Sequence, residues 1–212
     1  MPQTTGLILS GGGARAAYQV GVLAAIGRMR QEAGAAQDNP FPVISGTSAG
    51  AINAAFLASN ADRFDAAIGE LVDVWKHFQV SQVYRSDVLG MIRSGARWIS
   101  LLSLGWLITQ KRFRPKSLLN NDPLRDLLAK RIDLKRLPAL MEQGHLRALA
   151  ITASSYSTGE HITFYDSQQA ITPWVRNQRL AQCGRLSHEH LMASSAIPFI
   201  FPAIGLEGPQ GR

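Results

Sequence analysis

Two glycine-rich turns near the start of the chain hold the residues best suited to chemistry. The second turn reads Val-Ile-Ser-Gly-Thr-Ser-Ala-Gly over residues 43–50 and fits the pattern G-x-S-x-G around Ser48. In this pattern a serine hydroxyl stands on a sharp turn between a strand and a helix, and the glycines beside it leave room for that turn. The sequence therefore predicts that Ser48 is a nucleophile.

The first turn offers a place for negative charge. Residues 10–15 read Ser-Gly-Gly-Gly-Ala-Arg, directly before a helix-like stretch. Successive backbone N–H groups at such a position can bind an anion. With a serine nucleophile nearby, Gly11, Gly12 and Gly13 could form the oxyanion hole of an acyl-transfer enzyme. Arg15 has two readings: it orients an acid or a phosphate group, or it is a surface charge.

The same glycines allow a second interpretation as a dinucleotide site. Gly11-x-Gly13-x-x-Ala16 satisfies the fingerprint G-x-G-x-x-G/A, which requires an acidic residue about 20 positions later at a strand end. Glu32 has about the right spacing but falls in the polar tail of the expected helix. The nucleotide interpretation therefore lacks its second anchor.

The bulk composition is that of a globular domain. The chain has 212 residues, 46% of them hydrophobic, and a net charge of +7. Its only cysteine, Cys183, excludes an internal disulfide and fits a reducing compartment. The chain shows neither a basic and apolar leader nor an apolar run of about 18 residues. We expect a cytoplasmic protein that binds no metal or other cofactor.

The positive charge gathers around one apolar segment. Trp98–Ile108 is apolar and contains two tryptophans, and six basic residues but no acidic residue lie around it between Asp87 and Asp122. Such a segment can lie in a bilayer interface, which would place the protein at the periphery of the inner membrane. The alternative is a helix buried against the domain. We expect no nucleic-acid partner, because the basic residues do not alternate with aromatic ones.

Hydrophobic periodicity predicts an alternation of strands and helices. Residues 5–10 read as a buried parallel strand, and 14–30 as a helix whose apolar face carries Tyr18, Val22, Leu23, Ile26 and Met29. A strand at 43–45 and helices at 49–59 and 62–78 follow. This order favours a parallel sheet with right-handed crossovers. Further helices are expected from Asp122, at 134–143 and at 187–193, and two strands at 146–154 and 161–165.

Three blocks of the sequence resemble the signature blocks of the bacterial patatin-like phospholipases. They begin at Gly11 (Gly-Gly-Gly-Ala-Arg), at Gly46 (Gly-Thr-Ser-Ala-Gly-Ala-Ile-Asn) and at Ala193 (Ala-Ser-Ser-Ala-Ile-Pro-Phe-Ile-Phe-Pro). The resemblance implies a three-layer α/β/α fold with a mostly parallel central sheet. It also implies hydrolysis of lipid acyl esters by a Ser–Asp dyad, with Ser48 as nucleophile and Gly11, Gly12 and Gly13 as oxyanion hole, and without a metal or a catalytic histidine.

The dyad aspartate is not found in residues 1–212. The family carries it in an Asp-Gly motif shortly after the third block, and no Asp-Gly pair occurs in this sequence. We therefore expect a single patatin-like domain over 1–212, incomplete at its C-terminal end. Asp166 is the only strand-end substitute, and none of the five histidines stands where a hydrolase base is expected. A catalytically silent lipid- or partner-binding module of the same fold is the alternative.

Overall fold

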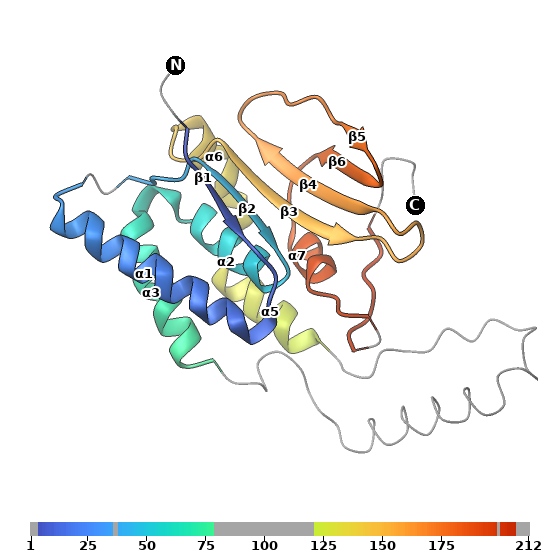
Figure 1. Cartoon of the computed structure of the whole chain (residues 1–212), viewed down its shortest axis with the longest axis horizontal. Coiled ribbons are helices and arrows are strands. Elements are labelled where there is room, and N and C mark those ends of the chain that lie inside the picture. Colours follow the sequence, from blue (N-terminus) through green and yellow to red (C-terminus); the bar gives the residue numbers. More distant parts are fainter. Residues whose placement is uncertain (1–3, 36–37, 79–120, 199, 207–212) are drawn as a thin grey trace, which may run out of the picture.

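The protein is built around one six-stranded sheet (Figure 1). The computed structural model describes residues 4–35, 38–78, 121–198 and 200–206. The strands are β1 (Gly6–Leu9), β2 (Val43–Thr47), β3 (Ala148–Ser154), β4 (His161–Ser167), β5 (Val175–Arg176) and β6 (Arg179–Cys183), and their order is β1-β2-β3-β4-β6-β5. The pairs β1–β2, β2–β3 and β4–β6 are parallel, and β3–β4 and β5–β6 are antiparallel. The predicted mixed α/β class with a mostly parallel central sheet is confirmed.

The helices begin within three residues of the starts that local sequence signals predict. They are α1 (Ala16–Glu32), α2 (Ala49–Ala58), α3 (Phe64–Lys76), α5 (Asp122–Arg131), α6 (Leu137–Glu142) and α7 (His188–Ser194), and 3₁₀ turns η1 (Gly13–Arg15), η2 (Ala61–Arg63) and η4 (Leu134–Arg136) precede α1, α3 and α6. Pro123 lies in the first turn of α5, where its missing N–H costs no helical bond. Ser187 and His190 form a capping box at the start of α7.

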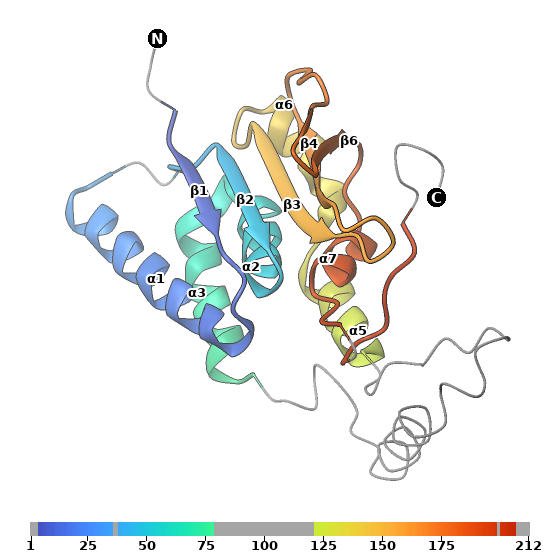
Figure 2. The same cartoon turned by 45° about the vertical axis from the view of Figure 1, so that its right-hand side comes forward.

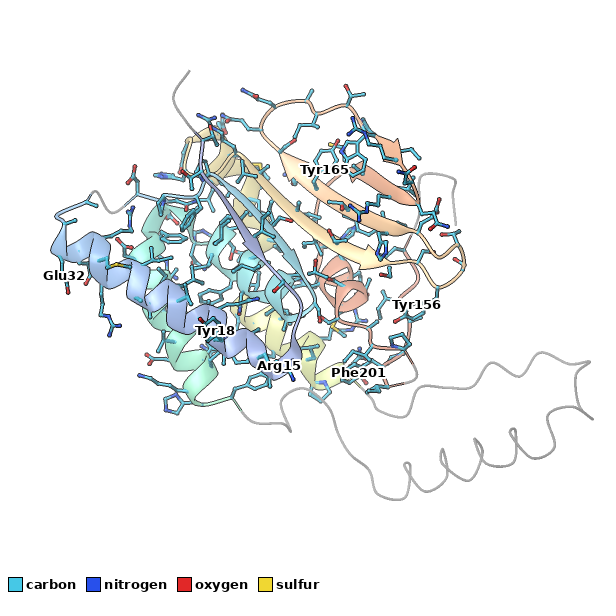
Figure 3. The ribbon with its side chains drawn as sticks, viewed as in Figure 1. Arg15, Tyr18, Glu32, Tyr156, Tyr165 and Phe201 are labelled. Atoms are coloured by element: carbon cyan, nitrogen blue, oxygen red, sulfur yellow. The ribbon has the colours of Figure 1, made fainter. Side chains whose placement is uncertain are left out.

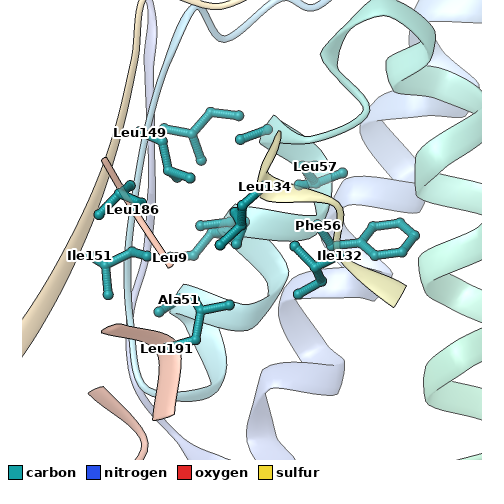
Figure 4. Close-up of a cluster of buried hydrophobic side chains, with 14 of the residues drawn as sticks. Leu9, Ala51, Phe56, Leu57, Ile132, Leu134, Leu149, Ile151, Leu186 and Leu191 are labelled. Atoms are coloured by element: carbon teal, nitrogen blue, oxygen red, sulfur yellow. The ribbon is translucent and has the colours of Figure 1, made fainter. Parts of the chain in front are cut away.

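The core lies between the sheet and the helices packed on one of its faces (Figures 2 and 4). Leu9, Leu149 and Ile151 project from β1 and β3 toward α2 and α7, where they meet Ala51 and Leu191. Helix α2 is rich in alanine and almost wholly buried, with Ala51, Ala54, Ala55, Leu57 and Ala58 inaccessible to solvent. Small side chains let this helix approach the strands closely, which places its N-terminus against the end of β2.

The predicted apolar face of α1 is wrong. Leu23 is buried, but Tyr18 is 79% exposed, and Val22 and Met29 also face solvent. The buried face is instead Ala16, Val20, Leu23 and Gly27, at helical spacing. Helix α1 packs on α3, and Gly27 lies against the side chain of Ile68 in α3. Close approach of two helices selected the small residues over the large ones.

The expectation that residues 5–10 form a buried strand is also wrong in part. Strand β1 is parallel to β2 as predicted, but it lies at the edge of the sheet and only Leu9 is buried. Ile8 points to the opposite face and is 81% exposed. An apolar run of this length cannot by itself distinguish a central strand from an edge strand.

The predicted interfacial segment cannot be compared with the structure. Trp98–Ile108 and its basic flanks lie outside the described residues. Of the helices that the structure describes, none combines the length and the apolar composition needed to cross a bilayer.

Candidate active site

Ser48 occupies a strained turn between β2 and α2. Its backbone has φ 55° and ψ −128°, a conformation that residues other than glycine rarely adopt. The neighbouring glycines make this turn possible. A Cβ added to Gly46 would lie 2.6 Å from Cα of Ala51, and one added to Gly50 would lie 2.6 Å from the carbonyl carbon of Leu9. Both glycines are therefore required by close backbone packing, and Ser48 stands at the N-terminus of α2.

A serine from the third block fastens this turn to the sheet. The N–H of Ser48 donates to Oγ of Ser194 at 2.7 Å, and Oγ of Ser194 donates to the carbonyl of Thr152 at 2.7 Å. Ser194 is the last residue of α7, and Thr152 lies in β3 beside Thr47. The Ser48 turn is thus held on one side by strand β2, which it directly follows, and on the other side by the hydrogen bond to Ser194 of α7.

The glycine turn lies directly against Ser48. A Cβ added to Gly11 would lie 3.3 Å from Cβ of Ser48. Gly12 accepts a hydrogen bond from the N–H of Arg15 at 3.1 Å, which starts η1, and Gly13 has φ 55°, the conformation in which glycine is favoured. All three glycines are exposed. The two turns that the sequence singled out are therefore adjacent at one end of the parallel strands.

An apolar cavity of about 180 Å³ opens beside the same serine. It runs between α2, α3 and α5, and most of its walls are aliphatic or aromatic side chains, among them Ile52, Phe56, Leu71, Trp75, Leu128 and Phe201. Ser48 and Gly13 line it, as does Ser195, whose Oγ is buried without a hydrogen-bond partner. Arg131 is the charged residue among the described residues that line it. The cavity suits a hydrocarbon chain whose polar end lies at Ser48.

Comparison with known proteins identifies the family of the chain. The family model described as patatin-like phospholipase matches residues 7–210. This chain belongs to the patatin-like phospholipase family. No curated protein matches the chain.

Two solved structures are similar in fold to this patatin-like chain. One is the type III effector protein ExoU, with 17% identity, a TM-score of 0.41, and coverage of 100% of this chain and 42% of that chain. The other is full-length SpcU in complex with full-length ExoU from the type III secretion system of Pseudomonas aeruginosa, with 19% identity, a TM-score of 0.41, and coverage of 76% and 35%. The chain spans less than half the length of those proteins.

The patatin-like chain separates the two parts of the dinucleotide fingerprint, the glycine turn and Glu32. Arg15 lies at the glycine turn and Glu32 at the far end of α1 (Figure 3). At 1.5 Å per residue, the helix puts them roughly 25 Å apart. Glu32 is thus no partner for a ligand held at Gly11–Gly13. The Arg15 side chain is exposed beside the turn.

Asp166 lies at the other end of the sheet from Ser48. In the register of β3 and β4, Thr152 faces Thr163 and Leu149 faces Asp166, whereas Ser48 follows Thr47, which pairs with Thr152. Asp166 is therefore displaced by three residues, or about 10 Å along the strand, and by two strands across. Burial raises its pKa, and Arg185 opposes that rise, but the register excludes a proton transfer with Ser48.

Among the described residues that line the cavity there is no carboxylate. In the described ranges no cluster of three His, Cys, Asp or Glu side chains is arranged to hold a metal ion. The late histidines have structural contacts. His188 Nε2 is 2.8 Å from the carbonyl of Ile132, and His190 caps α7 and packs against the ring of Phe164.

Two residues that contribute to the site, Ser194 and Asn53, have roles that no local sequence pattern predicts. Ser194 lies within the third block, but its hydrogen bond to Ser48 joins positions 146 residues apart. Asn53 lies within the second block, but its buried amide bonds to Gln19 of α1 and Trp75 of α3. Both roles depend on tertiary contacts between helices.

Proposed function

We propose that this protein is a serine acyl hydrolase that cleaves acyl esters of phospholipids or other lipids, with Ser48 as its nucleophile. The observation that carries the proposal is the position of Ser48, in a strained turn at the N-terminus of α2, between a glycine turn and an apolar cavity. A nucleophile, a set of backbone donors and an acyl-sized cavity are the parts that acyl transfer requires.

In the proposed reaction, Oγ of Ser48 attacks the ester carbonyl carbon. The N–H groups of Gly11, Gly12 and Gly13 stabilise the oxyanion that forms, and each such donor contributes on the order of 3 kcal/mol. The positive end of the α2 dipole lies next to the same oxygen. Collapse of the tetrahedral intermediate expels the alcohol and leaves an acyl group on Ser48, which water then removes.

The proposed base is an aspartate that forms a dyad with Ser48. It accepts the serine proton, returns it to the leaving alcohol, and later activates the water that releases the acyl group. The described residues around the cavity do not include this aspartate. We therefore assign the base to an aspartate outside the described residues.

The absence of a carboxylate among the described lining residues favours one alternative, a catalytically silent lipid-binding module. Such a protein would hold an acyl chain in the cavity without cleaving an ester. Such a module would have the same fold and the same apolar cavity walls as the hydrolase, but it would not cleave a substrate.

Lipid hydrolysis distinguishes the two functions. The protein expressed from its complete reading frame is incubated with phosphatidylcholine vesicles and, separately, with a triacylglycerol emulsion, and released fatty acid is measured. The hydrolase releases fatty acid, and Ser48→Ala abolishes the release while Ser157→Ala, at an exposed serine in the β3–β4 turn, does not. Retention of a fluorescent fatty acid with no release from either lipid would instead establish the silent module.

We also propose peripheral membrane contact through Trp98–Ile108 and its basic flanks. Replacing Trp98 and Trp106 by serine should weaken binding to anionic vesicles and leave cleavage of a short soluble ester unchanged. Unchanged vesicle binding would exclude this contact.

A further inference from the structure

A chain of hydrogen bonds joins the wall of the cavity to the glycine turn. Nε1 of Trp75 donates to Oδ1 of Asn53 at 2.9 Å, Nδ2 of Asn53 donates to Oε1 of Gln19 at 3.2 Å, and Nε2 of Gln19 donates to the carbonyl of Ser10 at 2.7 Å. Trp75 is in α3, Asn53 in α2 and Gln19 in α1, so the chain crosses three helices. It ends on the residue directly before Gly11.

The chemistry of the donors allows only one donor-to-acceptor direction along this series of hydrogen bonds. An indole N–H can only donate, so Asn53 must present its oxygen to Trp75 and its NH₂ to Gln19. Gln19 must then present its oxygen to Asn53 and its NH₂ to the Ser10 carbonyl. Reversal of either amide would place two donors or two acceptors face to face. The orientation of the Gln19 NH₂ group is therefore linked, through Asn53, to Trp75 in α3.

Burial makes the central amide costly to disturb. Asn53 is 0% exposed, and its NH₂ also lies 3.4 Å from the carbonyl of Ala16. A buried amide that lacks partners destabilises a protein, whereas Asn53 has a partner for each polar atom. Such satisfied buried networks hold one arrangement of the elements that they join.

We propose that Gln19 and Asn53 are positioning residues for the oxyanion turn. By holding the Ser10 carbonyl toward α1, Gln19 fixes the peptide plane that enters Gly11 and so aims the following N–H groups at the ester oxygen bound beside Ser48. Asn53 keeps Gln19 in the donating orientation. Trp75, which lines the cavity, connects the acyl-binding wall to the same turn. This inference rests on the proposed hydrolase function, since it assigns a role within that site.

Three variants separate positioning from simple helix packing. Gln19→Glu keeps the shape and the acceptor for Asn53 but puts an oxygen in place of the NH₂ that faces Ser10. Gln19→Met removes both hydrogen bonds of Gln19 at similar side-chain length, and Trp75→Phe removes the outermost hydrogen bond together with part of the cavity wall. Each variant is made in the full-length protein. Inactivation by an alkyl fluorophosphonate gives an apparent dissociation constant and a maximal rate of covalent modification.

The positioning role predicts a loss in the chemical step. Both Gln19 variants should lower the maximal rate of modification at least tenfold. Their apparent dissociation constants for the probe should not change, because the acyl cavity is intact. Trp75→Phe should lower the maximal rate less than the Gln19 variants do. Gln19→Glu keeps the acceptor for the buried Asn53 amide, so its thermal unfolding midpoint should stay close to that of the parent, whereas Gln19→Met removes this acceptor and should lower the midpoint. Parent-like maximal rates in both variants, or losses that only follow lowered unfolding midpoints, would overturn the inference.

Amide hydrogen exchange tests the same idea without activity. In Gln19→Met, a peptide spanning residues 7–17 should exchange faster than in the parent, whereas a peptide from α2 should not change. Unchanged exchange in the first peptide refutes the positioning role, whatever the labelling shows. Faster exchange in a protein that no fluorophosphonate labels would refute the hydrolase function and leave the positioning of the turn standing.

Discussion

The backbone N–H of Ser48 donates a 2.7 Å hydrogen bond to Oγ of Ser194. The same hydroxyl donates to the carbonyl of Thr152, so the end of α7 joins the nucleophile turn to β3. Ser195, the next residue, has a buried Oγ with no partner. Two adjacent serines thus have opposite energetic roles, which makes them a matched pair for mutation.

Ser194→Ala should lower the free energy of unfolding by about 1–3 kcal/mol, because it leaves the Ser48 N–H and the Thr152 carbonyl without a partner. It should also slow covalent modification of Ser48. Ser195→Ala, the control, should leave the free energy of unfolding unchanged or raise it, because an unsatisfied hydroxyl is lost. Urea unfolding measures both. Equal effects of the two substitutions would contradict the fastening role of Ser194.

Gly50→Ala should severely destabilise the fold, because its Cβ would lie 2.6 Å from the backbone of β1 at Leu9. The clash is with backbone, which cannot move aside as a side chain can. Gly69→Ala, in α3, is the control: its Cβ meets nothing within 4 Å, and alanine should add about 0.5–1 kcal/mol of helix stability. Thermal unfolding reports both changes. A Gly50→Ala protein as stable as the parent would show that the close approach is absent.

Ile52→Trp should shorten the acyl chain that the protein accepts. Ile52 lies one helical turn after Ser48 and lines the cavity of about 180 Å³. The added ring would fill space near the nucleophile, so the rate of modification by a dodecyl fluorophosphonate should fall at least tenfold more than that by an ethyl analogue. The short probe is the control within the same variant. Equal losses with both probes would argue against this cavity as the acyl site.

Stability should fall as the pH is lowered from about 7 to 5, in part through His190. Burial lowers the pKa of His190 from its usual 6.5, and its hydrogen bond with Ser187 opposes that shift only in part. The unfolded chain therefore binds a proton at higher pH than the folded one does, and unfolding becomes easier on acidification. Above both pKa values the contribution is fully present.

His190→Gln should reduce this dependence, because glutamine can keep the capping box with Ser187 but does not titrate. Free energies of unfolding in urea at pH 5, 6 and 7 measure the slope. The same substitution at His77, which is exposed at the end of α3, is the control. If His190→Gln leaves the dependence of the free energy of unfolding on pH unchanged, His190 does not cause the loss of stability at low pH.

Short-range signals were enough to predict the elements that frame the site. The spacing of Gly46, Ser48 and Gly50 predicted a strand–turn–helix, and β2, Ser48 and α2 follow in that order. Helix starts at Pro123 and Ser187 were readable for the same reason, since capping and proline geometry depend on neighbouring residues.

Long-range packing was beyond the sequence. The large apolar residues of α1 predict one face, whereas the helix buries Val20 and Gly27, and Gly27 lies against Ile68 of α3. The β5–β6 hairpin was not predicted, because its two-residue turn places Asn177 and Gln178 at positive φ, where a glycine is the usual signal. Ser194 and Asn53 depend in the same way on contacts that only the folded chain creates.

The central claim is that Ser48 is the nucleophile, and the site of covalent attachment tests it most directly. The protein from the complete reading frame is treated with a dodecyl fluorophosphonate and digested, and the modified peptide is sequenced by tandem mass spectrometry. The account predicts one stoichiometric adduct on Ser48, lost in Ser48→Ala. Attachment to Ser194 or Ser195 instead, or a Ser48→Ala protein labelled as fully as the parent, would contradict it.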